Sequence, residues 1–261
     1  MNNLLRASVK LLGTSLLLLL FIPVSLGAAA STLSPLTRRA RLAGVTSFFA
    51  RLILGLFNVR VSLKGRKLLR AGNEGRLVVS NHVSYIDVLV IASLAPSVFV
   101  TSVELRNTCL LGQLARLGGS LFVERRKASG LKHEINSIAQ ALETGFQVVL
   151  FPEGTTSNGD EVRPFKRSLL DAAIKAHRNV QPVCLRYTGV EGKPLSAKSR
   201  DAVFYYGRIS FFKHFPRFLA IRSVDLEVSV LDELVAGDSE TRKHLAERAH
   251  DAISAAYRAE A

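Results

Sequence analysis

The sequence predicts an α/β domain with a mixed, largely parallel central sheet flanked by helices, preceded by N-terminal membrane-associated helices. Between Arg76 and Leu185, short apolar runs alternate with amphipathic segments, which is the pattern of strands joined by helical crossovers. Ahead of them, the apolar stretch 11–30 has about the length that a helix needs to cross a bilayer. We therefore divide the 261 residues into an N-terminal membrane segment, 1–59, and a domain formed by 60–261.

The composition limits the classes of partner. The chain is 48% hydrophobic and has a formal net charge of +14, a balance that suits nucleic acid or an anionic membrane surface. Aromatic residues make up 7%, Trp is absent and no basic helix shows a base-reading pattern, so we expect a membrane partner and no nucleic acid. Cys109 and Cys184 stand far apart in apolar runs, without metal-ligand spacing. We expect two buried, reduced thiols, no disulfide and no metal site.

The apolar stretch 11–30 leaves several arrangements open. Its end, 28–31, resembles a signal-peptidase site, so a cleaved signal peptide is one alternative. Pro23 would kink a spanning helix and also permits a re-entrant hairpin. Four cations follow the stretch and two precede it, which favours the cytoplasmic side of the membrane for the domain. The four are Arg38, Arg39, Arg41 and Arg51, and the two are Arg6 and Lys10.

The segment 42–59 has apolar residues at helical spacing. It predicts a helix that lies in the membrane interface or packs on the first helix. An ordinary amphipathic core helix is the alternative. Residues 60–75 then predict a short strand and a polar turn.

In the domain, the apolar periodicity predicts each element in turn. Strands are expected at 77–80, 97–101, 120–123, 147–151, 180–187 and 224–231, and helices from Val88, at 104–117, 131–143, 169–176 and 239–258. Pro182 has no N–H to donate, which implies an edge strand or a bulge at 180–187. Residues 211–219 interleave aromatics with cations, which suits the membrane interface, with a core-packed loop as the alternative.

A His and an Asp stand at the turn between the first strand of the domain and its helix. His82 and Asp87 are five residues apart, and five residues along an ideal helix rotate a side chain by roughly 140°. The two can therefore meet only if His82 lies on the turn and Asp87 reaches back from the first helical turns. A His oriented by a carboxylate is the usual general base. The alternative is a polar residue at a helix start and an ordinary surface acid.

A second candidate region follows the strand at 147–151. The loop 152–159 is rich in Gly, Thr and Ser, so its backbone N–H groups and hydroxyls could bind an anion, although it is no Walker loop. Arg163, Lys166 and Arg167 come next, just before the expected helix, whose N-terminal amides would add to an anion site. Another charge run, 124–127, follows a strand. Solvated surface cations are the alternative for both runs.

These residues resemble the sequence blocks of glycerolipid acyltransferases of the 1-acylglycerol-3-phosphate acyltransferase (lysophosphatidate acyltransferase) type. Residues 81–87 match the family's Asn-His-x4-Asp, and 119–125 match a glycine and short apolar strand that end in an acid and Arg. Residues 151–157 match the third block, which begins Phe-Pro-Glu-Gly-Thr. Residues 180–183 match the fourth, a proline in a valine-rich strand. The four blocks occur in the family's order and together span about residues 76–188.

Two positions depart from the family pattern. Thr156 stands where the family often has Arg, and 165–168 read Phe-Lys-Arg-Ser where it often has Phe-Lys-x-Gly. Both lie near the expected phosphate site, so they leave the head group of the acceptor open. Relatives that acylate lyso-ornithine lipid share these blocks.

The resemblance implies transfer of an acyl group from acyl-CoA or acyl carrier protein, with no cofactor, to the free hydroxyl of a lysophospholipid. The expected acceptor is 1-acyl-glycerol-3-phosphate, which would give phosphatidate. Lyso-ornithine lipid is the alternative acceptor. A non-catalytic membrane lipid binder and, if the N-terminus is cleaved, a secreted hydrolase are the alternatives from other classes.

The resemblance also implies roles for individual residues. His82 would be the general base and Asp87 would orient it. Arg125, together with Glu153, Gly154 and Thr155, would hold the phosphate of the acceptor. Because Glu153 is itself an anion, we expect it to orient Arg125 or a neighbouring amide. Lys166 is a further candidate for substrate binding.

Overall fold

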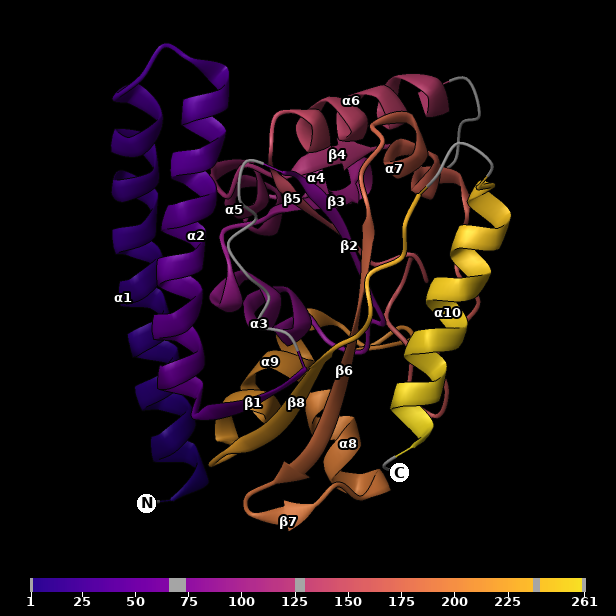
Figure 1. The fold of residues 1–261 in the computed structure, drawn as a ribbon. Helices are drawn as coiled ribbons and strands as arrows, with labels where there is room; N and C mark the ends of the chain where they lie inside the picture. The colour runs from indigo at the N-terminus through magenta and orange to yellow at the C-terminus, as the bar shows by residue number, and fades with distance from the viewer. Residues whose placement is uncertain (1, 66–73, 125–129, 237–239, 260–261) are drawn as a thin grey trace.

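A computed structural model describes residues 2–65, 74–124, 130–236 and 240–259. It has a central sheet with helices on both faces and a long helical hairpin along one side (Figure 1). The strands are β1 (Val59–Gly65), β2 (Arg76–Ser80), β3 (Val98–Ser102), β4 (Leu121–Val123), β5 (Gln147–Leu150), β6 (Val180–Val190), β7 (Lys193–Pro194) and β8 (Val224–Val230). The hydrogen-bonded order is β1-β8-β6-β2-β5-β3-β4, and β7 pairs with β6.

The sheet is mixed and largely parallel, as predicted. Strand β2 pairs in parallel with both β5 and β6, and β3 pairs in parallel with β4 and β5. Strands β8 and β7 pair with β6 in the antiparallel sense, and β1 pairs with β8 in parallel. Since neighbouring parallel strands end at the same edge of a sheet, the residues that follow β2 and β5 meet there.

The helices cover both faces of the sheet. They are α1 (Asn3–Ala30), α2 (Pro35–Phe57), α3 (Ile86–Leu94), α4 (Val103–Arg106), α5 (Leu111–Leu117), α6 (Leu131–Glu143), α7 (Asp171–Lys175), α8 (Ala197–Val203), α9 (Phe211–Ala220) and α10 (Arg242–Arg258), with a 3-10 turn at Ser168–Leu170. One apolar cluster joins α2, α3 and α9 to one face, and a second joins α6, α7 and α10 to the other. Strand β2 alternates between them, with Val78 in the first and Leu77 and Val79 in the second.

The helix predicted at 104–117 is wrong as a single element, because the chain forms two short helices, α4 and α5, there. The Thr108 hydroxyl donates to the Leu105 carbonyl oxygen and accepts from the Gly112 N–H. Such local side-chain bonds compete with the helix ladder. A Cβ on Gly112 would also lie 2.3 Å from the Arg106 carbonyl oxygen, so only glycine permits this close approach.

The expectations for Pro182 and Cys109 are also wrong. Pro182 lies inside a central strand, and the irregularity of β6 falls between Tyr187 and Gly189. The Pro182 carbonyl accepts from the N–H of Leu231, the residue just past β8, so the missing donor falls where that ladder ends. Cys109 is exposed in the turn between α4 and α5, whereas Cys184 is buried as expected.

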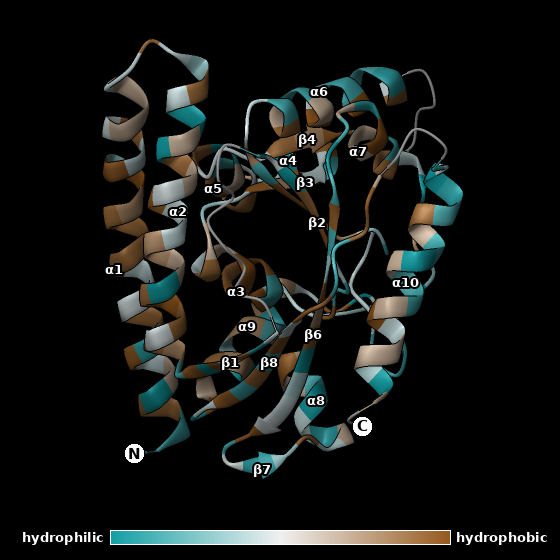
Figure 2. Cartoon of the chain, viewed as in Figure 1, coloured by the Kyte–Doolittle hydropathy of each residue, from teal (hydrophilic) through white to brown (hydrophobic). Residues whose placement is uncertain are grey.

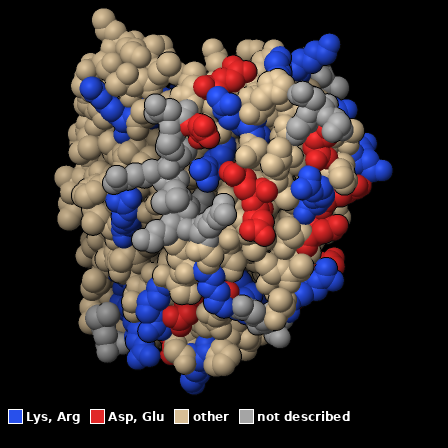
Figure 3. Space-filling model, viewed as in Figure 1, with Lys and Arg blue, Asp and Glu red and all other residues tan. Residues whose placement is uncertain are grey.

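Helices α1 and α2 form an antiparallel hairpin that lies lengthwise beside the domain (Figure 1). Both are long and apolar enough to cross a membrane by length and composition. Figure 2 shows the hydrophobic colouring of α1, and Figure 3 shows few charges over the hairpin. The exposed apolar side chains of α1 include Leu4, Leu5, Leu11, Leu12, Leu16, Leu19 and Leu20. An uncovered apolar surface of this extent is typical of a membrane-associated protein.

Both ends of α1 contact other parts of the chain. Near its start, Arg6 donates to the Ala220 carbonyl and buried Lys10 donates to the Phe57 and Ile221 carbonyls, at 2.6–2.8 Å. Further along, Phe21 packs edge-on against Phe49 of α2. Through these contacts α1 packs against α2 and against the end of α9.

Candidate active site

The turn between β2 and α3 is held to the sheet by Asn81. The Asn81 amide donates to the Leu185 carbonyl at 2.9 Å and accepts from the Leu185 N–H at 2.8 Å. Just after β2 ends, the Asn81 side chain thus makes the two hydrogen bonds to Leu185 of β6 that the backbone of a longer β2 would otherwise make. The chain is then free to turn at His82 and enter α3 at Ile86.

The structure brings the predicted pair together on this turn. The Nδ1 of His82 lies 2.8 Å from Oδ2 of Asp87, and Asp87 is fully buried. The same Oδ2 accepts the backbone N–H groups of Val83 and Ser84, at 2.7 and 2.9 Å. Oδ1 accepts the hydroxyl of Tyr187 at 2.6 Å. A buried carboxylate is stable only when its oxygens are hydrogen-bonded, and here four donors meet that need.

The loop after β5 closes around His82. The Phe151 ring stacks on the imidazole, with centroids 4.1 Å apart and planes 18° apart. The Glu153 carboxylate accepts the His82 N–H at 2.7 Å, and the Ser157 N–H donates to the His82 carbonyl at 2.9 Å. The backbone and the ring of His82 are therefore both fixed, while 17% of its side chain stays exposed.

Glu153 orients amides. Besides the His82 N–H, its carboxylate accepts the N–H of Arg163 at 3.2 Å. Burial raises the pKa of Glu153 to about 7, although these two N–H groups oppose the rise; the charge of Asp87 adds to it. Of the two roles expected for Glu153, the structure shows the bond to neighbouring amides, and Arg125 lies outside the described residues.

The other predicted binding residues surround the same loop. Gly154 has a φ of +78°, and a Cβ there would lie 2.7 Å from Nζ of Lys166, so the ammonium group lies directly over the glycine. The Lys166 N–H also donates to the Pro152 carbonyl at 2.9 Å. Thr155 is exposed. The structure therefore gathers Gly154, Thr155 and Lys166 beside the loop that holds His82.

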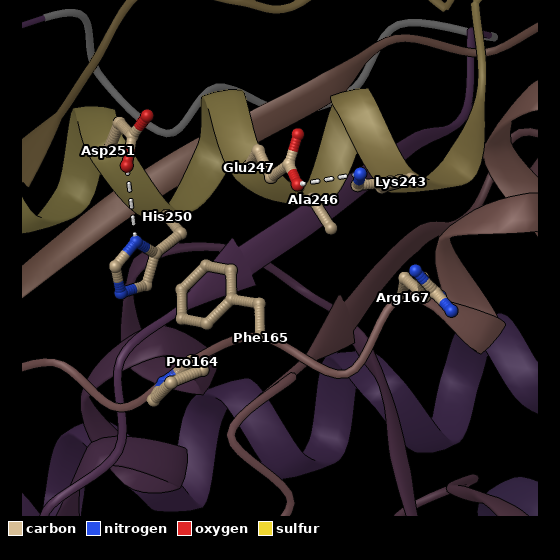
Figure 4. Close-up of a pocket in the computed structure, with 8 residues that line it drawn as sticks. All are labelled: Pro164, Phe165, Arg167, Lys243, Ala246, Glu247, His250 and Asp251. Atoms are coloured by element: carbon tan, nitrogen blue, oxygen red, sulfur yellow. Dashed lines mark hydrogen bonds and ion pairs between the residues drawn. The ribbon is translucent and has the colours of Figure 1, made fainter.

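A shallow groove lies beyond this loop, against α10 (Figure 4). Its lining residues are Pro164, Phe165, Arg167, Lys243, Ala246, Glu247, His250 and Asp251. Its charges are partly paired, because Lys243 lies 3.8 Å from Glu247 and His250 lies 3.3 Å from Asp251. The groove contains neither His82 nor Asp87, so it is separate from the candidate site at the turn.

The comparisons with known proteins agree with this geometry. A family model described as Acyltransferase matches residues 60–186. A lyso-ornithine lipid O-acyltransferase of Brucella abortus (strain 2308) is 33% identical over 218 residues, which cover 80% of this chain and 80% of the relative. The chain belongs to the glycerolipid acyltransferase family. A 1-acyl-sn-glycerol-3-phosphate acyltransferase of Neisseria gonorrhoeae is 28% identical over 182 residues, 70% of this chain and 69% of that relative.

A solved structure shows the same fold. The crystal structure of the 1-acyl-sn-glycerophosphate (LPA) acyltransferase PlsC from Thermotoga maritima matches with a TM-score of 0.72 and 16% sequence identity. The match covers 99% of this chain and 95% of that one. The helical hairpin and the α/β sheet thus belong to one shared architecture. The protein is an acyltransferase, and its family acts on lysolipids.

The geometry of this acyltransferase site suits proton transfer. Because Nδ1 of His82 faces a carboxylate, the proton of a neutral imidazole belongs on Nδ1 and the lone pair belongs on Nε2. Within the described residues, no three His, Cys, Asp or Glu side chains gather as a metal site. The site thus consists of the His82 imidazole, held by Asp87 and Phe151, beside the loop over which the Lys166 ammonium group lies.

Sequence reasoning missed two residues of the site. Tyr187 lies 100 positions from Asp87, and no local spacing connects a strand tyrosine with a distant turn. Phe151 was identified as part of a motif, but its stacking on His82 depends on β2 and β5 being neighbours. A strand order deduced from the sequence would have been needed to find either contact.

Removing the Tyr187 hydroxyl should weaken the orientation of Asp87. We expect Tyr187→Phe to lower kcat roughly tenfold, equivalent to about 1.4 kcal/mol, because one of four donors to the buried carboxylate is lost. The KM values should stay unchanged, since the lost hydroxyl acts on the orientation of His82 through Asp87 and not on substrate binding. Tyr206→Phe, which removes a hydroxyl bonded to Asp201, is the matched control. An unchanged kcat, or a loss shared by the control, would contradict this role.

The raised pKa of Glu153 predicts a pH dependence of stability. The folded protein holds the proton of Glu153 up to about pH 7, whereas the unfolded chain loses it near about pH 4.3. Stability from this group is thus complete below about pH 4.3 and lost as the pH rises through about 7. Relative to wild type, Glu153→Gln should therefore gain stability between pH 5 and 8. Thermal unfolding in detergent measures this, and a difference in Tm that is constant across that range would refute it.

Proposed function

We propose that this acyltransferase moves a fatty acyl group from a thioester donor, acyl-CoA or acyl carrier protein, to the free hydroxyl of lyso-ornithine lipid. The buried His82–Asp87 pair carries the proposal for the chemistry. Relatives named lyso-ornithine lipid O-acyltransferases, which match over most of their length, support the choice of acceptor. The acceptor hydroxyl gives its proton to Nε2 of His82 as its oxygen attacks the thioester carbonyl. The carbon–sulfur bond then breaks, and the same proton passes to the departing thiolate.

The roles follow from the contacts of each residue. Asp87 stabilises the imidazolium that forms when His82 takes the proton, and its three other donors keep the carboxylate aimed at Nδ1. Glu153 and Ser157 hold the His82 backbone, so the imidazole has little freedom to turn away. No covalent acyl-enzyme is needed, in agreement with the lack of a Gly-x-Ser-x-Gly elbow in the sequence.

An anionic group of the acceptor's head group would bind to the cations beside the loop. The ammonium group of Lys166 over Gly154 and the exposed Thr155 hydroxyl lie on the loop that holds His82, and Arg125 is a further cation by family resemblance. The head group of lyso-ornithine lipid offers a carboxylate to such a site. Thr156 takes the place of an arginine that is frequent in the family, which lowers the positive charge and suits a carboxylate better than a doubly charged phosphate.

Lysophosphatidate is the second candidate acceptor, and the sequence blocks by themselves favour it. A relative named for this activity also matches over most of its length. The cation at Lys166 would serve a phosphate as well as a carboxylate. For either acceptor we place the domain on the cytoplasmic side of the membrane, because both possible donors are cytosolic thioesters.

Loss of the imidazole should abolish most of the activity. We expect His82→Ala to lower turnover by about 10²- to 10⁴-fold, the usual contribution of a general base, with Tm and detergent elution unchanged. His133→Ala, an exposed histidine on α6, is the control. The measurement is transfer of radiolabelled acyl groups to lysolipid by purified protein. Activity near the wild-type level in His82→Ala would overturn the mechanism.

A panel of acceptors decides between the two lipids. With acyl-CoA or acyl carrier protein as donor, we expect the highest kcat/KM for lyso-ornithine lipid and a lower value for lysophosphatidate. Arg125→Ala and Lys166→Gln should raise the KM of the preferred acceptor more than they lower kcat, since they bind it without taking part in proton transfer. A preference for lysophosphatidate would replace the proposed acceptor and leave the His82 mechanism intact.

A further inference from the structure

Helix α9 leaves one face uncovered close to the active-site turn. Its inner face is buried, with His214 and Phe218 in the core. Its outer face carries exposed side chains at 212, 213, 216 and 217. Phe212 is 80% exposed, the highest value of any aromatic side chain among the described residues. Single exposed apolar side chains are common on protein surfaces, so the side chains around Phe212 decide what this face binds.

The outer face combines apolar and basic side chains in adjacent rows. Phe212 and Pro216 are four residues apart, as are Lys213 and Arg217, so each pair lies on one line along the helix. No Asp or Glu occurs from Ala202 to Val224. An aromatic side chain flanked by cations, without acids, is the composition of a helix that lies in a membrane interface.

This face is continuous with the apolar surface of the hairpin. The last turn of α9 touches the first turns of α1, where Arg6 donates to the Ala220 carbonyl and Lys10 donates to the Ile221 carbonyl. The exposed leucines of α1 begin at the same place, with Leu4 75% exposed. The acid at this junction, Glu191, is paired with Arg6 at 3.5 Å. A bilayer that covers the outer side of α1 therefore reaches α9 across a surface on which this negative charge is neutralised.

We propose that α9 is a second membrane-binding element, in which Phe212 enters the bilayer interface and Lys213 and Arg217 bind anionic lipid head groups. The partner is thus a bilayer that contains anionic lipid. The helix is coupled to the site through Tyr85, three residues after His82, whose ring packs on Phe211 and whose hydroxyl lies 3.2 Å from Nδ1 of His214. Membrane contact at α9 would hold the turn of His82 beside the lipid layer. The proposal does not depend on which lysolipid is acylated.

Fluorescence tests this contact directly, because the chain contains no Trp. The full-length protein with Phe212→Trp is reconstituted into vesicles of phosphatidylcholine and phosphatidylglycerol, with and without brominated phosphatidylcholine. We expect a blue-shifted emission that brominated lipid quenches and aqueous iodide does not. Val235→Trp, an exposed position that follows β8, is the control, and iodide alone should quench it. Quenching of the reporter at 212 by iodide alone would overturn the proposal. If neither quencher reached the reporter, the face would be covered by protein, a second copy of the chain, and the bilayer contact would be refuted.

Charge neutralisation gives an independent measurement. On the same anionic vesicles, Lys213→Gln with Arg217→Gln should raise the apparent KM for the lysolipid by about fivefold per cation removed. In neutral detergent micelles these variants should match wild type. Lys132→Gln with Lys175→Gln, on α6 and α7, removes the same charge far from α9 and should leave both values unchanged. An equal rise in KM for the two double variants would refute the lipid contact at α9. A wild-type protein without activity would contradict the proposed function and would not bear on that contact.

Discussion

The carboxylate of Asp87 is the constraint on which the site depends. A charge that is fully buried costs several kcal/mol unless hydrogen bonds replace its water. Its four donors come from the turn itself, from His82 and from a strand 100 positions away. Each of these elements must be in place for the oxygens of the buried Asp87 carboxylate to be hydrogen-bonded. The position of the imidazole is therefore determined by the folding of the sheet rather than by local preference.

The strand order explains why residues far apart in sequence meet at His82. Strand β2 lies between β5 and β6 and runs parallel to both, so the ends of the three strands share one edge. Strand β2 supplies the turn with His82, the chain after β5 supplies Phe151 and Glu153, and β6 supplies Tyr187. This is the general position of sites in α/β proteins, outside the carboxyl ends of neighbouring strands.

The sequence predicted the fold class, most strands and the meeting of His82 with Asp87, because periodicity and short spacing are local properties. It did not predict the break at Thr108, where side-chain hydrogen bonds outweigh helical periodicity. It also placed Pro182 at an edge or a bulge, although a central strand tolerates a proline where the neighbouring ladder ends. The contacts of Tyr187 and Phe151 required the strand order. No local pattern contains that order, since crossovers of similar length can lead to either side of a strand.

The cations of the hairpin show how it is joined to the α/β sheet and its helices. Lys10 donates to the last carbonyl of α2, Arg6 to the last of α9, and Arg51 to the Ser93 carbonyl near the end of α3. The final carbonyls of a helix have no partner within it, and positive charge is favourable there. Helix α3 begins at the turn of His82, and α9 packs on that turn through Tyr85. The hairpin therefore supplies hydrogen-bond donors to the C-terminal carbonyls of α3 and α9, the two helices that contact the turn of His82. The division into segments 1–59 and 60–261 remains a prediction from composition. The hydrogen bonds of Arg6, Lys10 and Arg51 to Ala220, Ile221 and Ser93 join residues on the two sides of that boundary.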